Sequence, residues 1–232
     1  MISAERLIET MWGGHPPRNA RVKLQGCVSG LRKALGGARS SCPHRGSLVT
    51  REPGYLLSPD GVTVDLLQYR ALLRLSDGEI SDGQVAAAAG HLGDALAMWR
   101  GPAYADVRTP VLCGMADALE RGRLLAVERK AECDLRLGRH EAVAEELTAV
   151  LAAHPFREGT RAVLMLALYR CGCRAEALEC YRIGRQLLHE QLGIEPGTPL
   201  RQLHERMLTD DPSLAVPPSR PARYDAEAGQ SR

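Results

Sequence analysis

The polar and cationic side chains between residues 18 and 33 are the part of this sequence best suited to chemistry. At about 100° per residue on a helix, most of them fall on one side. Arginine clamps phosphates or bonds guanine edges, glutamine bonds an adenine edge, and serine reaches a base or a phosphate. One exposed face with these groups is what a recognition helix for double-stranded DNA requires. The candidate contacts are Arg18, Arg21, Lys23, Gln25, Ser29, Arg32 and Lys33.

A solvated amphipathic helix in an arginine-rich protein is the alternative interpretation of that pattern. The segment that follows favours DNA binding. Residues 47–51 and 55–57 are predicted strands, joined by a turn at Glu52-Pro53-Gly54, because proline presets φ and the next glycine accepts a positive φ. Such a hairpin is the wing that reaches the backbone beside the major groove. Thr50 and Arg51 at its tip are therefore predicted phosphate contacts.

Two helices must hold this face in place. Ser3 is a suitable N-cap for a first helix, which the glycines and prolines of residues 13–17 end. Its apolar stripe comprises Leu7, Ile8, Met11 and Trp12. A second helix is predicted from about residue 18 to residue 35, with an apolar side of Ala20, Leu24, Cys27, Val28, Leu31 and Leu35. With a third strand expected at 62–64, this order is that of a winged helix-turn-helix.

After residue 65 the sequence is predicted to be helical. Asp65 is a candidate cap for a helix over 66–75, and Ser81 or Asp82 for one ending near residue 99. A loop follows at 99–106 and contains two aromatic residues of a kind that is usually buried. Further helices are predicted over 111–137, from about 138 to 153, and over 157–171, 174–192 and 199–209. Gly138 and Gly172 lie 34 residues apart, and each precedes a Glu-Ala pair. This period is typical of tetratricopeptide repeats, which stack into a surface that binds protein.

Charge divides the chain in the same way. Residues 1–64 carry a net charge of +5, residues 65–212 carry −4, and residues 213–232 carry +1. A basic segment suits a polyanion and an acidic one suits protein partners. The sequence therefore predicts a mainly α protein: a winged helix over 1–64, a helical-repeat domain over 65–212, and a tail over 213–232 whose Pro, Ser and Arg content predicts disorder.

Several classes of protein are excluded on composition and motifs. No uncharged apolar run approaches the roughly 20 residues of a membrane helix, and the charged N-terminus is not a signal peptide. Seven irregularly spaced cysteines indicate reduced thiols in a cytosolic protein. Cys171, Cys173 and Cys180 do not have a zinc spacing, and residues 26–30 place their serine mid-helix, unlike a nucleophile elbow. We therefore expect no enzyme activity, metal or cofactor.

Several stretches of the chain resemble one family. Residues 3–13 resemble the helix before the recognition helix of Streptomyces antibiotic regulatory proteins (SARPs), residues 24–36 resemble the recognition helix, and residues 48–55 resemble the wing. Residues 97–107, 134–140, 166–170 and 192–197 resemble the bacterial transcriptional activator domain. The similarity covers about residues 1–212, in the family's order.

The resemblance implies a pathway-specific transcriptional activator of an antibiotic or other secondary-metabolite gene cluster, of the small type with no ATPase or sensor domain. In that family the OmpR-like winged helix binds direct repeats in promoter DNA. The activator domain supports dimers or cooperative binding on DNA, and the complex recruits RNA polymerase through its sigma factor. Each of these properties is an expectation for this chain.

One departure from the family concerns the N-terminus. Family members begin with a small sheet and a first helix before the segment that opens here at Ser3. We therefore expect a truncated winged helix or a misassigned start. The alternative function is a helical-repeat adaptor for protein partners, with a DNA-binding segment that no longer works.

Overall fold

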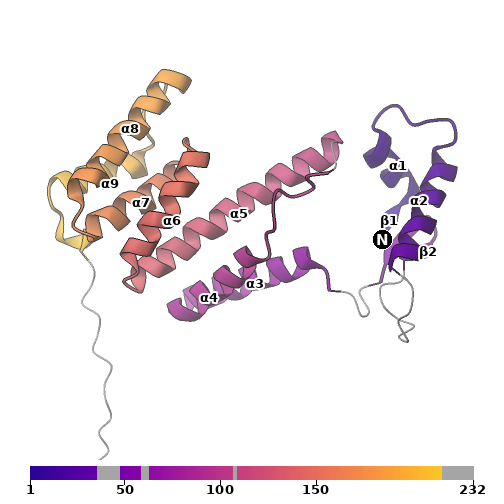
Figure 1. Cartoon of the computed structure of the whole chain (residues 1–232), viewed down its shortest axis with the longest axis horizontal. Coiled ribbons are helices and arrows are strands. Elements are labelled where there is room, and N and C mark those ends of the chain that lie inside the picture. The colour runs from indigo at the N-terminus through magenta and orange to yellow at the C-terminus, as the bar shows by residue number, and fades with distance from the viewer. Residues whose placement is uncertain (36–47, 59–62, 107–108, 216–232) are drawn as a thin grey trace, which may run out of the picture. The chain divides into compact units, whose positions relative to one another are not determined.

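The computed structural model describes residues 1–35, 48–58, 63–106 and 109–215. These residues are mainly helical and divide into two compact units, one within residues 1–130 and one that begins at residue 131 (Figure 1). The expected loop over 38–46 and the tail from residue 216 onward lie outside the described residues. None of the described helices is long and apolar enough to cross a membrane.

The first unit begins with the elements predicted for a winged helix. They are β1 (Ile2–Ser3), α1 (Ala4–Trp12), α2 (Ala20–Leu35), β2 (Leu48–Arg51) and β3 (Gly54–Leu57). The three strands form an antiparallel sheet in the order β1-β3-β2, which confirms the hairpin. The third strand of the sheet is β1, whereas residues 63 and 64 of the strand expected at 62–64 are not in a strand, and residue 62 lies outside the described residues.

Gly54 is required in the hairpin for a reason other than the predicted one. Its φ is not in the left-handed region. A Cβ at this position would lie 2.0 Å from the main-chain oxygen of Ile2, because β1 crosses directly beside it. The turn over Glu52 and Pro53 contains a cis peptide bond, and the carbonyl oxygen of Pro53 accepts a hydrogen bond from Ala4 N at 3.1 Å. The close approach of two strands therefore excludes every side chain at residue 54.

The two helices of this region bury fewer side chains than their patterns predict. Ser3 caps α1 as expected, since its hydroxyl accepts a hydrogen bond from Arg6 N at 3.1 Å. However, α1 has no buried residue, and α2 buries only Ala20, Leu24 and Val28. The other three residues of the predicted apolar side are exposed: Cys27, Leu31 and Leu35.

Helices α3 (Asp65–Ser81) and α4 (Val85–Ala97) pack side by side, and α5 (Pro110–Arg136) follows (Figure 1). Asp65 lies in the first turn of α3 and accepts a hydrogen bond from Leu66 N at 2.7 Å. The predicted caps at Ser81 and Asp82 are wrong: α3 extends to Ser81, and Gln84 is the N-cap of α4. The buried side chains of this pair are Tyr69, Ser76, Ala88, Ala89, Leu92 and Ala95.

A glycine turn of one geometry recurs between helices. Gly83, Gly138 and Gly172 have φ values of 77°, 80° and 81°, in the left-handed region that glycine adopts without strain. In each turn, the glycine N–H donates to the carbonyl three residues back, and the next N–H donates to the carbonyl five residues back. The predicted repeat is therefore present in the structure. The turn at Gly83 is a further copy, which the 34-residue spacing does not reveal.

The second unit contains the end of α5 with α6 (His140–Ala153), α7 (Glu158–Arg170), α8 (Arg174–Leu192) and α9 (Thr198–Leu208). A short 3-10 turn, η1 (Pro212–Leu214), ends the described fold. Leu214 is only 3% exposed and packs in one cluster with Met165, Tyr181, Leu200 and Met207. Residues 213 and 214 therefore belong to the folded unit, contrary to the prediction that disorder begins at residue 213.

Arg161 is a buried cation that ties α7 to its surroundings. It is 3% exposed, and its guanidinium donates to the carbonyl oxygens of Cys180 and Pro155, both at 2.8 Å. Gly184 of α8 lies against this side chain, because a Cβ there would be 2.2 Å from Nε of Arg161. Since the guanidinium is fixed by two hydrogen bonds, it has little freedom to move aside.

The variant Gly184→Ala is expected to destabilise the second unit by about 2 kcal/mol, because the added methyl group overpacks a fixed arginine. Urea unfolding followed by circular dichroism measures the change. The matched control is Gly90→Ala, on an exposed position of α4 with no atom near the new Cβ. That control is expected to be neutral or slightly stabilising. Equal stability of Gly184→Ala and the unmodified chain would contradict the packing argument.

The carboxylate of Asp211 gives the second unit a pH-dependent contact. It accepts hydrogen bonds from the N–H and hydroxyl of Ser213 and from Arg206, which lower its pKa from 3.8 to about 2. A lowered pKa means that the stabilisation is present near neutral pH and is lost as the pH falls from about 4 to about 2. Asp211→Asn should therefore lower the melting temperature near pH 7. The difference should shrink as the pH falls below about 4 and disappear below the folded-state pKa of about 2. An equal deficit at pH 7 and at pH 2 would refute this prediction.

Candidate DNA-binding surface

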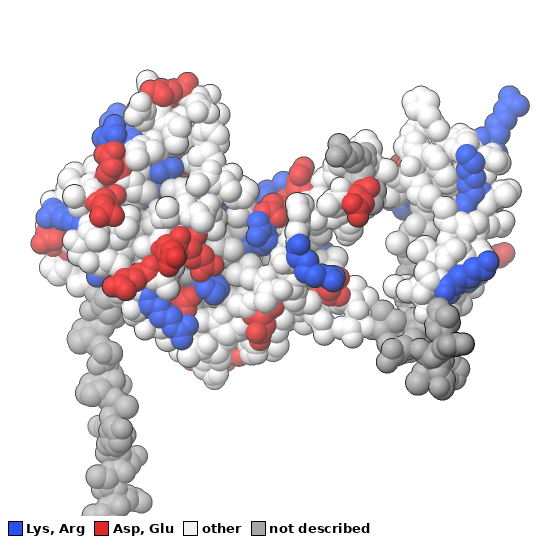
Figure 2. All heavy atoms as spheres, viewed as in Figure 1, with Lys and Arg blue, Asp and Glu red and all other residues white. Residues whose placement is uncertain are grey.

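The polar side of α2 and the adjoining wing form the candidate site. Each of the nine residues predicted to contact DNA is exposed to solvent. Among the charged side chains that Figure 2 shows over this N-terminal region, more are blue than red, whereas the two colours are mixed over the helices that follow. The nine residues are Arg18, Arg21, Lys23, Gln25, Ser29, Arg32, Lys33, Thr50 and Arg51.

Arg32 joins the helix to the wing. Its Nε donates to the main-chain oxygen of Leu48 at 2.7 Å, and its terminal nitrogen donates to the hydroxyl of Thr50 at 2.8 Å. Both partners lie on β2, in the hairpin. The structure therefore brings two predicted DNA contacts together, as partners of one another. The sequence contains no spacing rule for this contact, because the partners are 18 residues apart.

Two carboxylates near this surface, both on α1, are paired with arginines. Glu5 on α1 accepts a hydrogen bond from Arg21 at 2.7 Å, and Glu9 accepts one from Arg6 at 2.7 Å. All four side chains are well exposed, so these ion pairs contribute little to stability. Their effect is on charge, since they cancel two of the acids beside α2.

The remaining cations of the surface carry uncompensated charge. Arg18, Lys23, Lys33 and Arg51 form no ion pair within the described residues. Arg18 lies in the turn before α2 instead of inside the helix. Lys23 lies two residues before Gln25 and so points about 200° away from it around the helix axis. The structure thus groups most of the predicted residues on one side and leaves Lys23 on another.

One residue on the polar side of α2 was not predicted. Val22 is 66% exposed and lies three residues before Gln25, on the same side of the helix. An exposed apolar side chain among polar ones is suited to contact with a thymine methyl group. Its exposure was the missing information, because valine in an amphipathic helix is normally assigned to the buried side.

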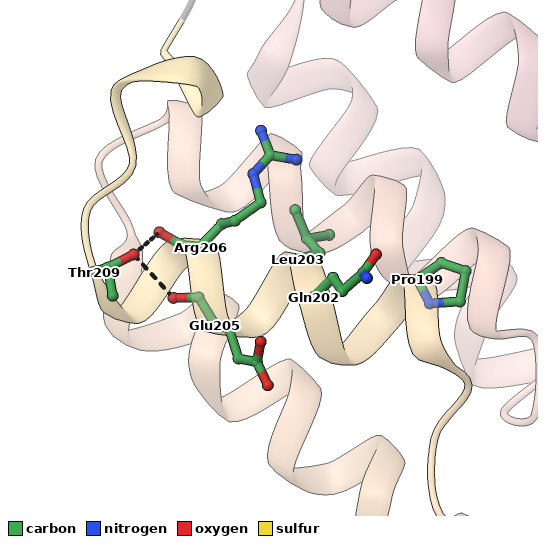
Figure 3. Close-up of a pocket in the computed structure, with 6 residues that line it drawn as sticks. All are labelled: Pro199, Gln202, Leu203, Glu205, Arg206 and Thr209. Carbon is green, nitrogen blue, oxygen red and sulfur yellow. Dashed lines mark hydrogen bonds between the residues drawn. The ribbon is translucent and has the colours of Figure 1, made fainter.

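In the second unit, a shallow hollow runs along α9 (Figure 3). Two of the polar side chains that line it, Arg206 and Thr209, already bond within the protein. Arg206 binds Asp211 and Ser213, and the hydroxyl of Thr209 donates to the main-chain oxygens of Glu205 and Arg206. Across the described parts of the chain, no three His, Cys, Asp or Glu side chains are grouped to hold a metal ion.

Comparison with known proteins places the chain in a family. Residues 64–208 match the model of the bacterial transcriptional activator domain. The chain is 36% identical over 220 residues to the regulatory protein AfsR of Streptomyces griseus, covering 95% of this chain and 22% of AfsR. It is 34% identical over 218 residues to the regulatory protein DnrI of Streptomyces peucetius, covering 92% of this chain and 80% of DnrI.

A solved structure extends the similarity to the fold. The chain superposes on Mycobacterium tuberculosis EmbR, solved in complex with a low affinity phosphopeptide, with a TM-score of 0.83 and 36% identity. The match covers 91% of this chain and 55% of EmbR, so the chain spans only part of the length of EmbR and of AfsR. The relatives are named as regulators, not as enzymes. The chain therefore belongs to the Streptomyces antibiotic regulatory protein family, and its residues 64–208 form a bacterial transcriptional activator domain.

Proposed function

We propose that this protein is a sequence-specific transcriptional activator that binds direct repeats in the promoters of a secondary-metabolite gene cluster. The observation that carries the proposal is an exposed polar side of α2 that is hydrogen-bonded through Arg32 to the β2–β3 hairpin. A helix and a wing held together in this way can meet the major groove and its flanking backbone at once. The names of its relatives AfsR and DnrI, both regulatory proteins, support the same function.

Each residue of the surface has a proposed role. Gln25, Ser29 and Val22 face base edges, with Val22 against a thymine methyl group. Arg18, Arg21, Lys33 and Arg51 contact phosphates, while Lys23 contributes positive charge from its own side of the helix. Arg32 and Thr50 position the wing. The net charge of +5 over residues 1–64 favours the approach of a polyanion.

The domain over 64–208 is proposed to make the protein contacts. Its helices carry an acidic balance, and stacked helix pairs form surfaces that bind protein. We assign to it the recruitment of RNA polymerase through the sigma factor, and the contacts between copies on adjacent DNA repeats. The division proposed for the chain is therefore DNA binding by residues 1–64 and activation by residues 65–212.

A second candidate function is a helical-repeat adaptor that no longer binds DNA. The incomplete burial of the winged-helix part favours it: α1 buries no side chain, while Met11, Leu31 and Leu35 are exposed. Fluorescence anisotropy with duplexes from promoters of neighbouring biosynthetic genes separates the two functions. Tight binding that resists non-specific competitor and falls steeply with salt supports the activator. Weak binding that competitor abolishes supports the adaptor.

Base contacts and phosphate contacts should respond differently to substitution. Gln25→Ala is expected to cost about 1–3 kcal/mol on the specific duplex and little on random duplex, because it removes a contact to a base edge. Lys33→Ala should weaken binding to both duplexes and lower the salt slope by about one. Arg182→Ala, which removes an exposed arginine of α8, is the control and should change neither the affinity for the two duplexes nor the salt slope. Equal losses on both duplexes for Gln25→Ala would exclude a role in sequence recognition.

The role of Arg32 is testable through its partner. Arg32→Ala should weaken binding to both duplexes by about 1 kcal/mol, because the wing loses its anchor. Arg32→Lys should not restore affinity, since an ammonium group cannot reproduce the guanidinium fork. Thr50→Val should give part of the same loss, and the double variant should bind no worse than Arg32→Ala. Additive losses in the double variant would instead indicate two independent contacts to DNA.

A further inference from the structure

One side of α3 is exposed to solvent and carries large apolar side chains. The buried residues of α3, Tyr69 and Ser76, lie on its other side, and α3 packs against α4. Leu67 and Leu75 are 55% and 54% exposed, so more than half of each leucine remains in water. At 100° per residue, four exposed side chains lie within about 70° of the direction opposite the buried pair: Leu67, Arg70, Arg74 and Leu75.

Helix α5 extends this exposed surface. Arg129 of α5 donates a hydrogen bond to the carboxylate of Asp77 on α3 at 2.6 Å. Asp77 lies one turn after Arg74, and Leu125 lies one turn before Arg129, so the ion pair connects the exposed sides of the two helices. Leu125 is 52% exposed. All of these residues belong to the first unit.

The combined surface, which we call the α3–α5 face, carries an excess of positive charge. Asp77 is already paired, and Asp117 lies one turn before the arginine that α5 contributes. The excess is a local exception, because residues 65–212 carry a net charge of −4. Three exposed arginines of the face form no ion pair within the described residues: Arg70, Arg74 and Arg121.

Leucine and arginine side chains are interspersed on this face. A single exposed leucine is ordinary, whereas several together with unpaired charges indicate an interaction site. Leu67 and Leu75 are eight residues apart, which is about 12 Å along the helix axis. A partner helix presents aliphatic side chains at the same spacing, seven or eight residues apart. A DNA backbone offers phosphates to the arginines but no aliphatic side chains to the leucines.

We propose that the α3–α5 face docks an amphipathic helix of a partner protein, whose aliphatic side chains are flanked by Asp or Glu. The aliphatic side chains cover the three leucines, and the carboxylates pair with the three free arginines at the rim. The proposal rests on the proposed function, under which residues 64–208 make the protein contacts, and it names the surface and the chemistry of one such partner.

The probe for the test is a fluorescein-labelled synthetic peptide of about 18 residues, long enough to form a helix, with Leu on one side and Glu on the other. Fluorescence anisotropy with the full chain should show saturable binding that weakens as salt is added. Two control peptides define the chemistry. One has the same residues in an order without an apolar side, and one has Lys in place of Glu. Each should bind at least about ten-fold more weakly.

Matched variants of the chain locate the site. Leu75→Ser should lower the affinity for the peptide about ten-fold, and Arg70→Gln combined with Arg74→Gln should lower it roughly five-fold and reduce its salt dependence. Leu208→Ser on α9, where the leucine is 52% exposed, and Arg182→Gln on α8 are the controls and should leave the affinity unchanged. Because Leu75 is exposed, its replacement should not change the melting temperature.

Several outcomes would overturn the proposal. They are no saturable binding of the acidic peptide, equal binding of the lysine peptide, and unchanged affinity in Leu75→Ser. A dimer of the unmodified chain that Leu75→Ser converts to a monomer in sedimentation equilibrium would assign the face to a second copy instead. Displacement of the peptide by random duplex, with weaker duplex binding in the arginine variant, would assign it to nucleic acid.

The peptide titrations contain no promoter DNA, so they separate this proposal from the activator function. Loss of peptide binding with intact promoter binding contradicts only the docking face. Failure of the chain to bind promoter duplex contradicts the activator, and the peptide affinities are then read without reference to it.

Discussion

The helical architecture depends on one backbone constraint, the left-handed glycine between the helices of a pair. At Gly83, Gly138 and Gly172 the chain reverses with the same two hydrogen bonds, and each following helix begins two residues later. Any other residue would be strained at these positions. Because the turn sets the angle and the register of each pair, the buried faces of α3 and α4, and of α7 and α8, can be lined by small residues such as Ala88, Ala95 and Ala177. The close packing of each helix pair therefore depends on its glycine turn.

The winged-helix part is held together by different means. Its helices bury only three side chains, all on α2, so hydrophobic packing contributes little. Directional contacts replace it: Arg32 to β2, Arg21 to Glu5, and the strand pairing that excludes a side chain at Gly54. These are exposed hydrogen bonds and ion pairs of modest strength. The two parts of the chain therefore differ in how their stability responds to salt, since charged contacts are screened and buried alanines are not.

Local patterns predicted most of the fold. The 3.6-residue periodicity identified the helices, and the order helix, helix, hairpin identified the winged helix, because both signals lie within a few residues of chain. The failures involved partners that are distant in sequence. Cys27, Leu31 and Leu35 fit an apolar side, but periodicity does not state whether anything covers it. Arg32 and Thr50 each fit a DNA contact, yet they face each other across 18 residues of chain. Gly54 was assigned to the turn, although the neighbouring β1 is what requires it. The third glycine turn was missed because its separation from the next, 55 residues, breaks the 34-residue period.

The winged-helix part has little core, so under the proposed function it would gain stability from the DNA that it binds. Any partner that binds only the folded form stabilises it by mass action, and phosphate contacts supply such binding without regard to sequence. Arg18, Lys33 and Arg51, free of ion pairs within the described residues, are placed to supply it. Under the proposed function, non-specific contact would first order α1 and α2, and base contacts from Gln25 and Ser29 would then select the site. In that sequence of events, the affinity for random duplex and the stability of the winged helix are coupled. A substitution that removes a phosphate contact therefore also lowers the population of the folded winged helix. The few buried residues of this region would then set how much of the phosphate binding energy is consumed in ordering it, while the base contacts distinguish one promoter from another.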